Sequence, residues 1–251
     1  MINRLKATKF FVIIAFFAVF VFLPGIVAFV TDWWWFSEVG YSQIFIKSLI
    51  AKIALFGAAG FFAAVFLLAN FSLAIRSTRS AGSGWTAILP AALTGQQVVS
   101  VTDRTVKKVV VALSAVIAFF FGLVSAGNWQ EVLKFISGAA FGASDPLFNK
   151  DIGFYVFSLP ALQAGLGLAK ALVILTLAGS AIIYFLRGSL RVASLQLLKQ
   201  IRIDPRARIH LGILLAIFLA TIAAGVYLSR FALLTSQSGL VFGATYTDAT
   251  V

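Results

Sequence analysis

Five apolar runs, each about as long as a bilayer is thick, constrain this chain more than any other feature. An α-helix rises about 1.5 Å per residue, so crossing a hydrocarbon core of about 30 Å takes roughly 20 apolar residues. Only 11% of the residues are charged, whereas an ordinary soluble domain has about 25%. The sequence therefore predicts an all-α membrane protein, a polytopic transmembrane helix bundle of about five spans with short in-plane amphipathic helices. The predicted spans lie near residues 10–30, 53–75, 109–127, 159–186 and 211–228.

The distribution of basic residues predicts how these spans are oriented, because cytoplasmic loops carry an excess of Lys and Arg. One side of the membrane receives Arg4, Lys6, Lys9, Arg76, Arg79, Arg104, Lys107, Lys108, Arg187, Arg191, Lys199, Arg202, Arg206 and Arg208. The other side receives Lys47, Lys52, Lys134, Lys150 and Arg230. We expect a cytoplasmic N-terminus and an extracytoplasmic C-terminus in the cell membrane. The net charge of +12 then reflects orientation and anionic lipid headgroups at the cytoplasmic loops, and we expect no nucleic-acid partner.

The first run resembles a signal peptide because basic residues precede it. It is too long and lacks a small-residue cleavage pattern, so the sequence predicts an uncleaved signal anchor. Pro24-Gly25 lies inside this run and is expected to kink the helix or to end its regular part.

Tryptophans mark the predicted outer interface. Trp33, Trp34 and Trp35 follow the first span, where an indole buries its ring and keeps its N–H near water. We interpret them as an aromatic belt, with a stacking platform for a sugar or aromatic ligand as the alternative. Trp129 belongs to the same belt.

Two short amphipathic segments are predicted to lie in the membrane plane. Asn128–Ala140 has an apolar face opposite a polar one, with Asn128 as its N-cap, and is expected at the outer leaflet as a structural support or, alternatively, as a gate. Ser189–Ile203 is predicted to be a basic helix on the inner side, ended by Asp204-Pro205. Arg76–Trp85, rich in Ser and Gly, is predicted to be a flexible cytoplasmic loop.

Residues that carry chemistry are scarce. The chain has no cysteine, which excludes disulfides, thiolate nucleophiles and zinc–thiolate sites. It has one histidine, His210, which we interpret as an interface residue at the inner end of the fifth span. No protease or hydrolase motif is present. The sequence predicts no enzyme activity, no cofactor and no metal site.

Lys170 is the one charged residue well inside an apolar run, and such residues are functional candidates by default. If its helix enters the bilayer at Leu159, Lys170 lies about 16 Å deep, near the midplane. If the span is Leu166–Phe185, its ammonium reaches the outer interface or pairs with an outer carboxylate. The latter is our prediction. Small residues four apart, Gly60/Ala64 and Gly167/Ala171, are predicted to let helices pack closely.

Three segments resemble the bacterial uncharacterised protein family 0182. They are Asp32–Phe45, Phe141–Gln163 and Ser238–Val251, in the same order as in that family, and the block Asp145–Tyr155 (DPLFNKDIGFY) is the most specific. The resemblance runs along essentially the whole chain. It implies a multi-pass protein with about seven N-terminal spans followed by a large extracytoplasmic region, and it implies no activity or catalytic residue. Residues 1–251 are thus expected to be an N-terminal transmembrane domain, truncated before further spans.

The block Asp145–Phe157 can also be interpreted from its residues. Turn-forming residues precede an aromatic stretch, Gly153–Phe157, expected to be extended or interfacial. We predict a compact outer loop packed against the helix Asn128–Ala140. A cation or ligand site formed by Asp145, Asn149 and Asp151 is the alternative.

Two functions remain open at this stage. The first is a membrane-anchoring or scaffold domain for an extracytoplasmic region or an envelope partner. The alternative is a transporter or channel for a small or lipid-like substrate, but no span supplies an Asp or Glu as a partner for Lys170. The sequence favours the anchor.

Overall fold

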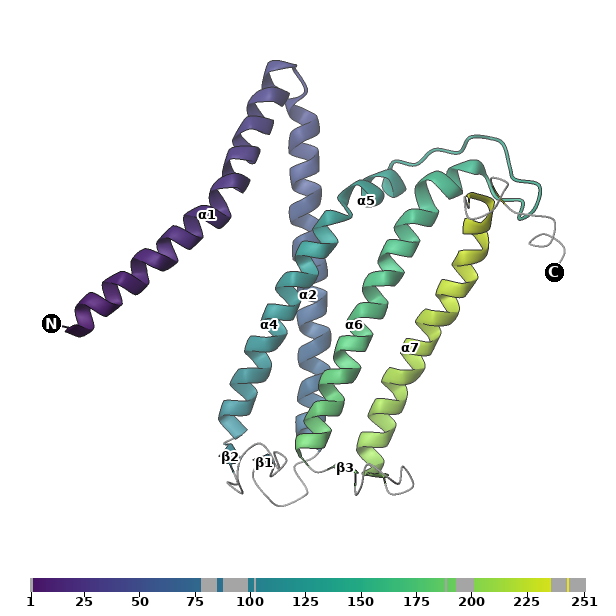
Figure 1. The fold of residues 1–251 in the computed structure, drawn as a ribbon. Coiled ribbons are helices and arrows are strands. Elements are labelled where there is room, and N and C mark those ends of the chain that lie inside the picture. Colours follow the sequence, from purple (N-terminus) through teal and green to yellow (C-terminus); the bar gives the residue numbers. More distant parts are fainter. Residues whose placement is uncertain are drawn as a thin grey trace. The chain divides into compact units, whose positions relative to one another are not determined.

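The computed structural model describes residues 2–77, 85–87, 99–101, 103–187, 189–192, 201–235 and 243, and it consists chiefly of long helices (Figure 1). The helices are α1 (Ile2–Glu38), α2 (Ser42–Ser77), α4 (Asp103–Gly127), α5 (Trp129–Ile136), α6 (Leu159–Leu186) and α7 (Pro205–Ala232). A π-helical turn, η2 (Phe154–Ser158), precedes α6, and a 3-10 turn, η4 (Leu233–Thr235), follows α7. Two antiparallel pairs join short strands: β1 (Trp85–Ala87) with β2 (Val99–Val101), and β3 (Leu190–Val192) with β4 (Ile201–Ile203).

Four of the described helical segments are long and apolar enough to cross a membrane: Ser42–Ser77, Asp103–Gly127, Phe154–Leu186 and Pro205–Thr235. They contain the second to fifth predicted spans. The first predicted span, residues 10–30, lies within α1, which is helical through Pro24 rather than ending there. The chain is an all-α membrane protein, and the expected number of about five spans is approximate.

The chain divides into two compact units, residues 1–51 and 52–251. In the first unit, α1 and the beginning of α2 meet at a tight turn in which Gly40 has a φ of 77°. Phe45 is buried there, and the rings of Phe29 and Trp33 each pack edge-on against it at a centroid distance of 5.4 Å. This aromatic corner holds the turn between the two helices.

The core of the second unit forms where α2, α4, α6 and α7 meet. Its buried residues are Ala63, Leu67, Phe71, Ala74, Ile75, Ala118, Leu172, Ile183, Tyr184 and Ala207. Half of them come from α2, more than from any other helix, so the Lys52–Ser77 part of this helix is the element against which the others pack. Large apolar side chains on the remaining helix faces are exposed, as expected for surfaces that contact lipid.

Glycines allow the backbones of this core to approach closely. A Cβ added at Gly122 on α4 would lie 2.7 Å from the carbonyl oxygen of Phe56, and one at Gly60 on α2 would lie 3.2 Å from the carbonyl oxygen of Ala118. The close-packing role predicted for Gly60 is therefore confirmed. The same prediction was wrong for Gly167, because a Cβ there would meet nothing within 4 Å.

The prediction of an in-plane helix over Ser189–Ile203 was wrong for the residues that the structure describes. Leu190–Val192 and Ile201–Ile203 are instead paired strands, with Arg191 opposite Arg202; residues 193–200 lie outside the described part of the chain. Each strand alternates apolar, basic and apolar residues, and three of these six residues are β-branched, a pattern that favours strand over helix. The predicted boundary at Asp204-Pro205 is confirmed, since β4 ends at Ile203 and α7 begins at Pro205.

Two further boundaries differ from the predictions. The helix predicted over Asn128–Ala140 ends at Ile136, and the Asn128 side chain makes no capping bond because its amide donates backwards to the Val124 carbonyl at 3.0 Å. The predicted loop Arg76–Trp85 begins two residues late, since α2 continues to Ser77, and residues 78–84 lie outside the described part of the chain.

We expect Gly122→Ala to destabilise the protein by about 1–3 kcal/mol, because the added methyl group overlaps the Phe56 carbonyl and forces α2 and α4 apart. Gly167→Ala is the matched control: it changes the same atoms in a transmembrane helix with open space around it, and should be neutral or slightly stabilising. Unfolding of the two purified variants in mixed micelles with increasing dodecyl sulfate measures the difference. Equal stability would contradict the close approach of α2 and α4.

Candidate functional site

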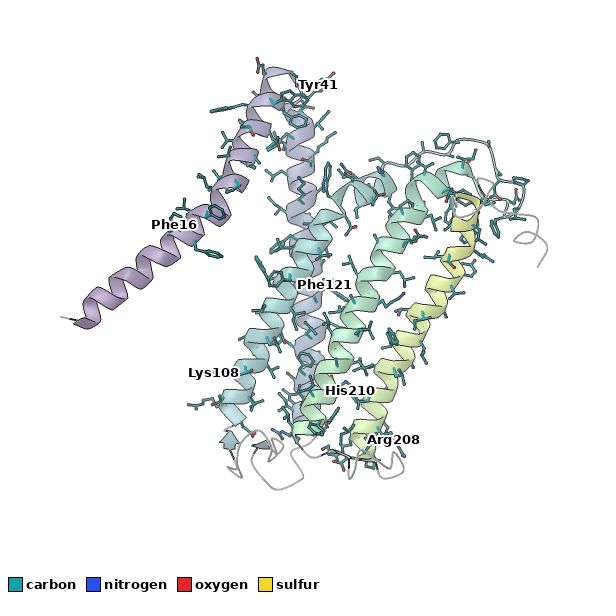
Figure 2. All side chains as sticks on the ribbon, viewed as in Figure 1. Phe16, Tyr41, Lys108, Phe121, Arg208 and His210 are labelled. Carbon is teal, nitrogen blue, oxygen red and sulfur yellow. The ribbon has the colours of Figure 1, made fainter. Side chains whose placement is uncertain are left out.

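A hydrogen-bonded chain of polar side chains crosses the second unit at its basic end, by which we mean the end where α2 and α6 finish and α4 and α7 begin. His210 of α7 lies at its centre (Figure 2). Its Nε2 lies 3.0 Å from Oδ1 of Asn70 on α2, and its Nδ1 lies 2.9 Å from the hydroxyl of Tyr184 on α6. The Tyr184 hydroxyl also lies 3.1 Å from Oγ of Ser77 on α2. Tyr184 is 0% exposed and His210 is 7% exposed.

The partners of Asn70 indicate where the protons of this chain lie. Its Nδ2 donates to the Phe66 carbonyl at 2.7 Å, so its Oδ1 accepts from Nε2–H of His210. In a neutral imidazole the other nitrogen is then an acceptor, and the Tyr184 hydroxyl donates to it. Every side chain of this hydrogen-bonded chain thus has a partner on its own helix or on a neighbouring one. This arrangement locks three helices together and leaves neither ring nitrogen of His210 for a metal.

An ion pair reinforces the same end. Arg187, directly after α6, donates from its guanidinium to Oδ1 of Asp103, the first residue of α4, at 3.0 Å. The Arg187 side chain is only 9% exposed. Separating the two side chains would leave the Arg187 charge unpaired in a poorly solvated site, which is unfavourable. The pair therefore holds the start of α4 against the end of α6.

At the opposite end, which we call the loop end, Asp145 organises the segment that the sequence singled out. Its Oδ1 accepts from the backbone N–H groups of Leu147 (2.9 Å) and Phe148 (2.6 Å). Its Oδ2 accepts from Lys150 N–H (2.9 Å) and from the Tyr155 hydroxyl (2.7 Å). Burial would raise the pKa of Asp145, but these hydrogen bonds outweigh it and hold the pKa below its ordinary value.

Asp151 plays the same part in the next turn of this loop. Its carboxylate accepts from the backbone N–H groups of Phe141 (3.0 Å), Gly142 (2.9 Å) and Gly153 (2.7 Å). The hydrogen bonds from Phe141 and Gly153 lower the pKa of Asp151 most. Asn149 adopts a left-handed conformation with a φ of 53°, which Asn tolerates better than most residues.

The structure thus brings Asp145, Asn149 and Asp151 into one loop, but the carboxylates face the backbone. A carboxylate offers about four lone-pair sites, and the four donors around Asp145 occupy them. A cation would have to displace these donors. Among the described residues, no group of three His, Asp or Glu side chains is arranged to hold a metal ion. The geometry favours a loop-forming role for these residues over the cation site.

Aromatic rings clamp this loop to the end of α7. Phe231 is 2% exposed, and the rings of Phe148 and Phe154 each lie 5.1 Å from it, edge-on. The Arg230 guanidinium lies 3.9 Å from the ring centre of Tyr227 and 5.6 Å from that of Phe148. Cation–π and edge-to-face contacts of this kind fix both partners in orientation. We call this set, Phe148, Phe154, Tyr155, Tyr227, Arg230 and Phe231, the α7 clamp.

The loop also packs against the segment that follows α5. The rings of Phe141 and Phe157 stack at 5.8 Å, and a Cβ at Gly138 would lie 2.9 Å from Cβ of Phe157. This confirms the predicted packing of the loop against the Asn128–Ala140 region. Gly153–Phe157 was predicted to be extended or interfacial, and the extended conformation was wrong, because Phe154–Ser158 is a π-helical turn continuous with α6. The interfacial position stays a prediction.

Lys170 is half-buried and is the central residue of the apolar segment Phe154–Leu186. Its ammonium lies against α7 at Gly225, where a Cβ would be 3.7 Å from Nζ. Within the described part of the chain, no carboxylate lies within ion-pair distance of it. Whether it reaches the interface remains a prediction.

The predicted interface tryptophans differ in their surroundings, and the aromatic belt stays a prediction. Trp33 packs against Phe45, whereas Trp34 is 67% exposed. Consecutive residues of a helix point about 100° apart, so Trp33, Trp34 and Trp35 offer no common face to a ring, which argues against a stacking platform. Trp129 is half-buried, and the Lys52 ammonium lies 5.1 Å from its ring centre.

The family of the chain follows from its comparison with known proteins. The sequence pattern of an uncharacterised protein family, UPF0182, matches residues 9–251. The chain belongs to the UPF0182 family. It is 33% identical to a UPF0182 protein of Trichlorobacter lovleyi over 94% of this chain, and 34% identical to one of Geobacter sulfurreducens over 96%. Each match covers 26% of the relative.

A UPF0182 protein of a further Geobacter strain is 32% identical over 97% of this chain and 26% of its own length. The chain therefore spans about a quarter of the length of the curated relatives that it matches, and the matching part is their N-terminal region. No solved structure matches it.

The polar chain of this UPF0182 protein was missed by sequence reasoning, which placed His210 at the interface. Asn70 and Tyr184 lie in apolar spans, where polar side chains face the protein interior and pair with one another. That signal could have indicated partners for His210. It could not have selected them, because the pairing depends on how α2, α6 and α7 face each other.

We expect Tyr184→Phe to destabilise this UPF0182 chain by about 1–3 kcal/mol, since it leaves Nδ1 of His210 buried without a donor. Tyr227→Phe is the control, because it removes the same atom from an exposed side chain. Thermal unfolding in detergent, monitored by circular dichroism, measures both. If both variants unfold at the same temperature as the unaltered protein, the hydrogen-bonded side chains around His210 contribute nothing to helix packing.

Proposed function

We propose that this region is a non-catalytic membrane domain that anchors an extracytoplasmic region, or an envelope partner, at a fixed point on the loop end. The observation that carries the proposal is the α7 clamp. A loop whose two carboxylates already accept hydrogen bonds from within the loop has no evident chemical use, but it holds the last turn of α7 through contacts of Phe148 with Phe231 and Arg230. Whatever follows α7 would leave the membrane from a rigid site.

The polar groups of the basic end support the same proposal. A transport pathway usually needs charged or polar groups with alternative partners. Here Tyr184 and His210 are buried and Asn70 is half-buried, and His210 hydrogen-bonds to both of the others. Lys170 is the observation that favours a transporter instead, because a half-buried cation in the middle of α6 has no carboxylate partner in the described part of the chain.

The proposed topology places the basic end in the cytoplasm of a cell whose plasma membrane holds the protein, with the N-terminus inside and the C-terminus outside. The basic loops then face anionic lipid headgroups. The bias in Lys and Arg between the two sides supports this orientation.

The orientation predicts which positions an impermeant maleimide can reach in intact cells. Because the chain has no cysteine, single cysteines report cleanly. Ser137→Cys at the loop end should be labelled from outside, and Lys108→Cys at the basic end only after the membrane is opened; both positions are exposed. Labelling of Lys108→Cys in intact cells would show that the orientation is the opposite of the proposed one.

The α7 clamp predicts a fixed distance between the segment after α5 and the last turn of α7. Spin labels on Ser137→Cys and on the residue that begins α7's last turn, Ser229→Cys, should give a narrow distance distribution that Phe231→Ala broadens. Phe120→Ala, which removes an equally large ring from an exposed position on α4, is the control and should leave it narrow. An unchanged distance distribution in Phe231→Ala would show that the α7 clamp is not the basis of anchoring.

The transporter alternative is tested on the same protein in liposomes. Anchoring predicts no ion leak above that of empty vesicles and no hydrolase activity. A saturable flux that is lost in Lys170→Ala and kept in Lys170→Arg would show that transport, and not anchoring, is the function of this region.

A further inference from the structure

A groove between α2 and α4 at the basic end has the character of a lipid site. Its volume is about 300 Å³. Its lining residues are Leu68, Ser72, Ile75, Arg76, Lys107, Val110 and Val111. Arg76 lies in the last turn of α2 and Lys107 in the first turns of α4, so the cations are at the mouth of the groove. The apolar residues extend from there toward the middle of the membrane.

The charges around this groove are strongly unbalanced. A second, wider hollow of about 740 Å³ adjoins it, shares Lys107 and Val111 with it, and adds Arg104 and Lys108. The one carboxylate that lines either hollow belongs to Asp103, and it already accepts a hydrogen bond from Arg187. In the described part of the chain, neither Arg76 nor Lys107 lies within ion-pair distance of a carboxylate. The groove therefore carries uncompensated positive charge.

The surface of α2 beyond the groove suits an acyl chain. Phe61, Val65 and Leu68 follow one another at helical spacing along the face that carries Ser72 and Arg76. Phe61 is 73% exposed and Val65 is 50% exposed. Phe61 lies about 22 Å from Arg76 along the helix axis, which is more than the thickness of one leaflet of the hydrocarbon core, about 15 Å.

We propose that the groove binds an anionic phospholipid. The lipid phosphate lies between the Arg76 guanidinium and the Lys107 ammonium, where the planar donor fork of Arg suits two phosphate oxygens. One acyl chain follows Leu68, Val65 and Phe61, and Ser72 lies between the phosphate site and this path. A lipid site here depends on the protein being in a membrane and not on the anchoring role, so either can fail without the other.

The test uses the 251-residue chain with a single cysteine inside the groove, Ser72→Cys. The probe is the rate at which this thiol reacts with a small maleimide in detergent. Added phosphatidylglycerol should slow the reaction by about tenfold or more at saturation, whereas phosphatidylcholine and inorganic phosphate should leave it nearly unchanged. A lipid-facing cysteine, Val226→Cys, at an exposed site on α7, corrects for general coating by lipid.

Charge variants then assign the effect to the groove. Arg76→Gln/Lys107→Gln should weaken protection by phosphatidylglycerol roughly 30-fold, because each cation near a lipid surface contributes about one factor of five or more. Arg206→Gln/Arg208→Gln removes two exposed cations from the same end of the protein, on α7, and should leave protection intact. Lys107→Arg keeps the charge and should also retain it, which controls for a change in folding.

Three results would overturn the proposal. Equal protection by phosphatidylcholine would show that acyl chains enter without selection of the headgroup. Equal protection by inorganic phosphate would show a site for a soluble anion. Equal loss of protection in the α7 variant would show a general effect of net charge rather than a site between α2 and α4.

Discussion

Hydrocarbon offers no water to a polar side chain, so each such group in a membrane-embedded protein needs a partner within the protein. The chain Asn70–His210–Tyr184–Ser77 meets this constraint at the basic end, and the rest of the second unit depends on it. It connects α2, α6 and α7 by directional bonds, whereas apolar side chains alone pack against lipid almost as well as against each other. The close contact of Phe71 on α2 with Gly179 on α6 becomes possible once these helices are held in register.

Different interactions hold the two ends of the second unit together. At the basic end, a buried histidine and the Arg187–Asp103 pair fix helices directly. At the loop end, Asp145 and Asp151 gather backbone N–H groups of a segment that has little regular secondary structure, and aromatic rings then attach it to α7. At both ends, the polar groups that could take part in a reaction already have hydrogen-bond or ion-pair partners within the protein. These arrangements support the proposed role of the region as a rigid membrane domain. In the described part of the chain, the groove between α2 and α4 carries two cations, Arg76 and Lys107, that no carboxylate pairs with.

Sequence reasoning predicted the helices well where hydrophobic length dominates and poorly where local and tertiary effects compete. Long apolar runs located α2, α4, α6 and α7, because spanning a bilayer leaves few alternatives to a helix. The N-terminal boundaries were less accurate, since α2 begins at Ser42 and not near residue 53. The basic stretch Ser189–Ile203 was predicted to be a helix because apolar residues also recur there at helical spacing. The shorter alternation Leu190-Arg191-Val192 and Ile201-Arg202-Ile203 was the better guide. For the candidate site, Asp145, Asn149 and Asp151 were correctly singled out as one loop, but their role was not evident, since a carboxylate that binds a cation and one that caps a turn occur in the same residue pattern.

The sequence by itself determined the class of protein, its membrane segments, its bias in basic charge and its membership of UPF0182, because these depend on composition and order along the chain. Only the tertiary structure decided which polar groups meet. His210 becomes a bridge between Asn70 and Tyr184, and Phe231 becomes the centre of a clamp, because residues far apart in sequence converge when the helices pack. Helix periodicity states which face of one helix is polar or apolar. It does not state which neighbouring helix that face meets, and that pairing is what gives each of these residues its role.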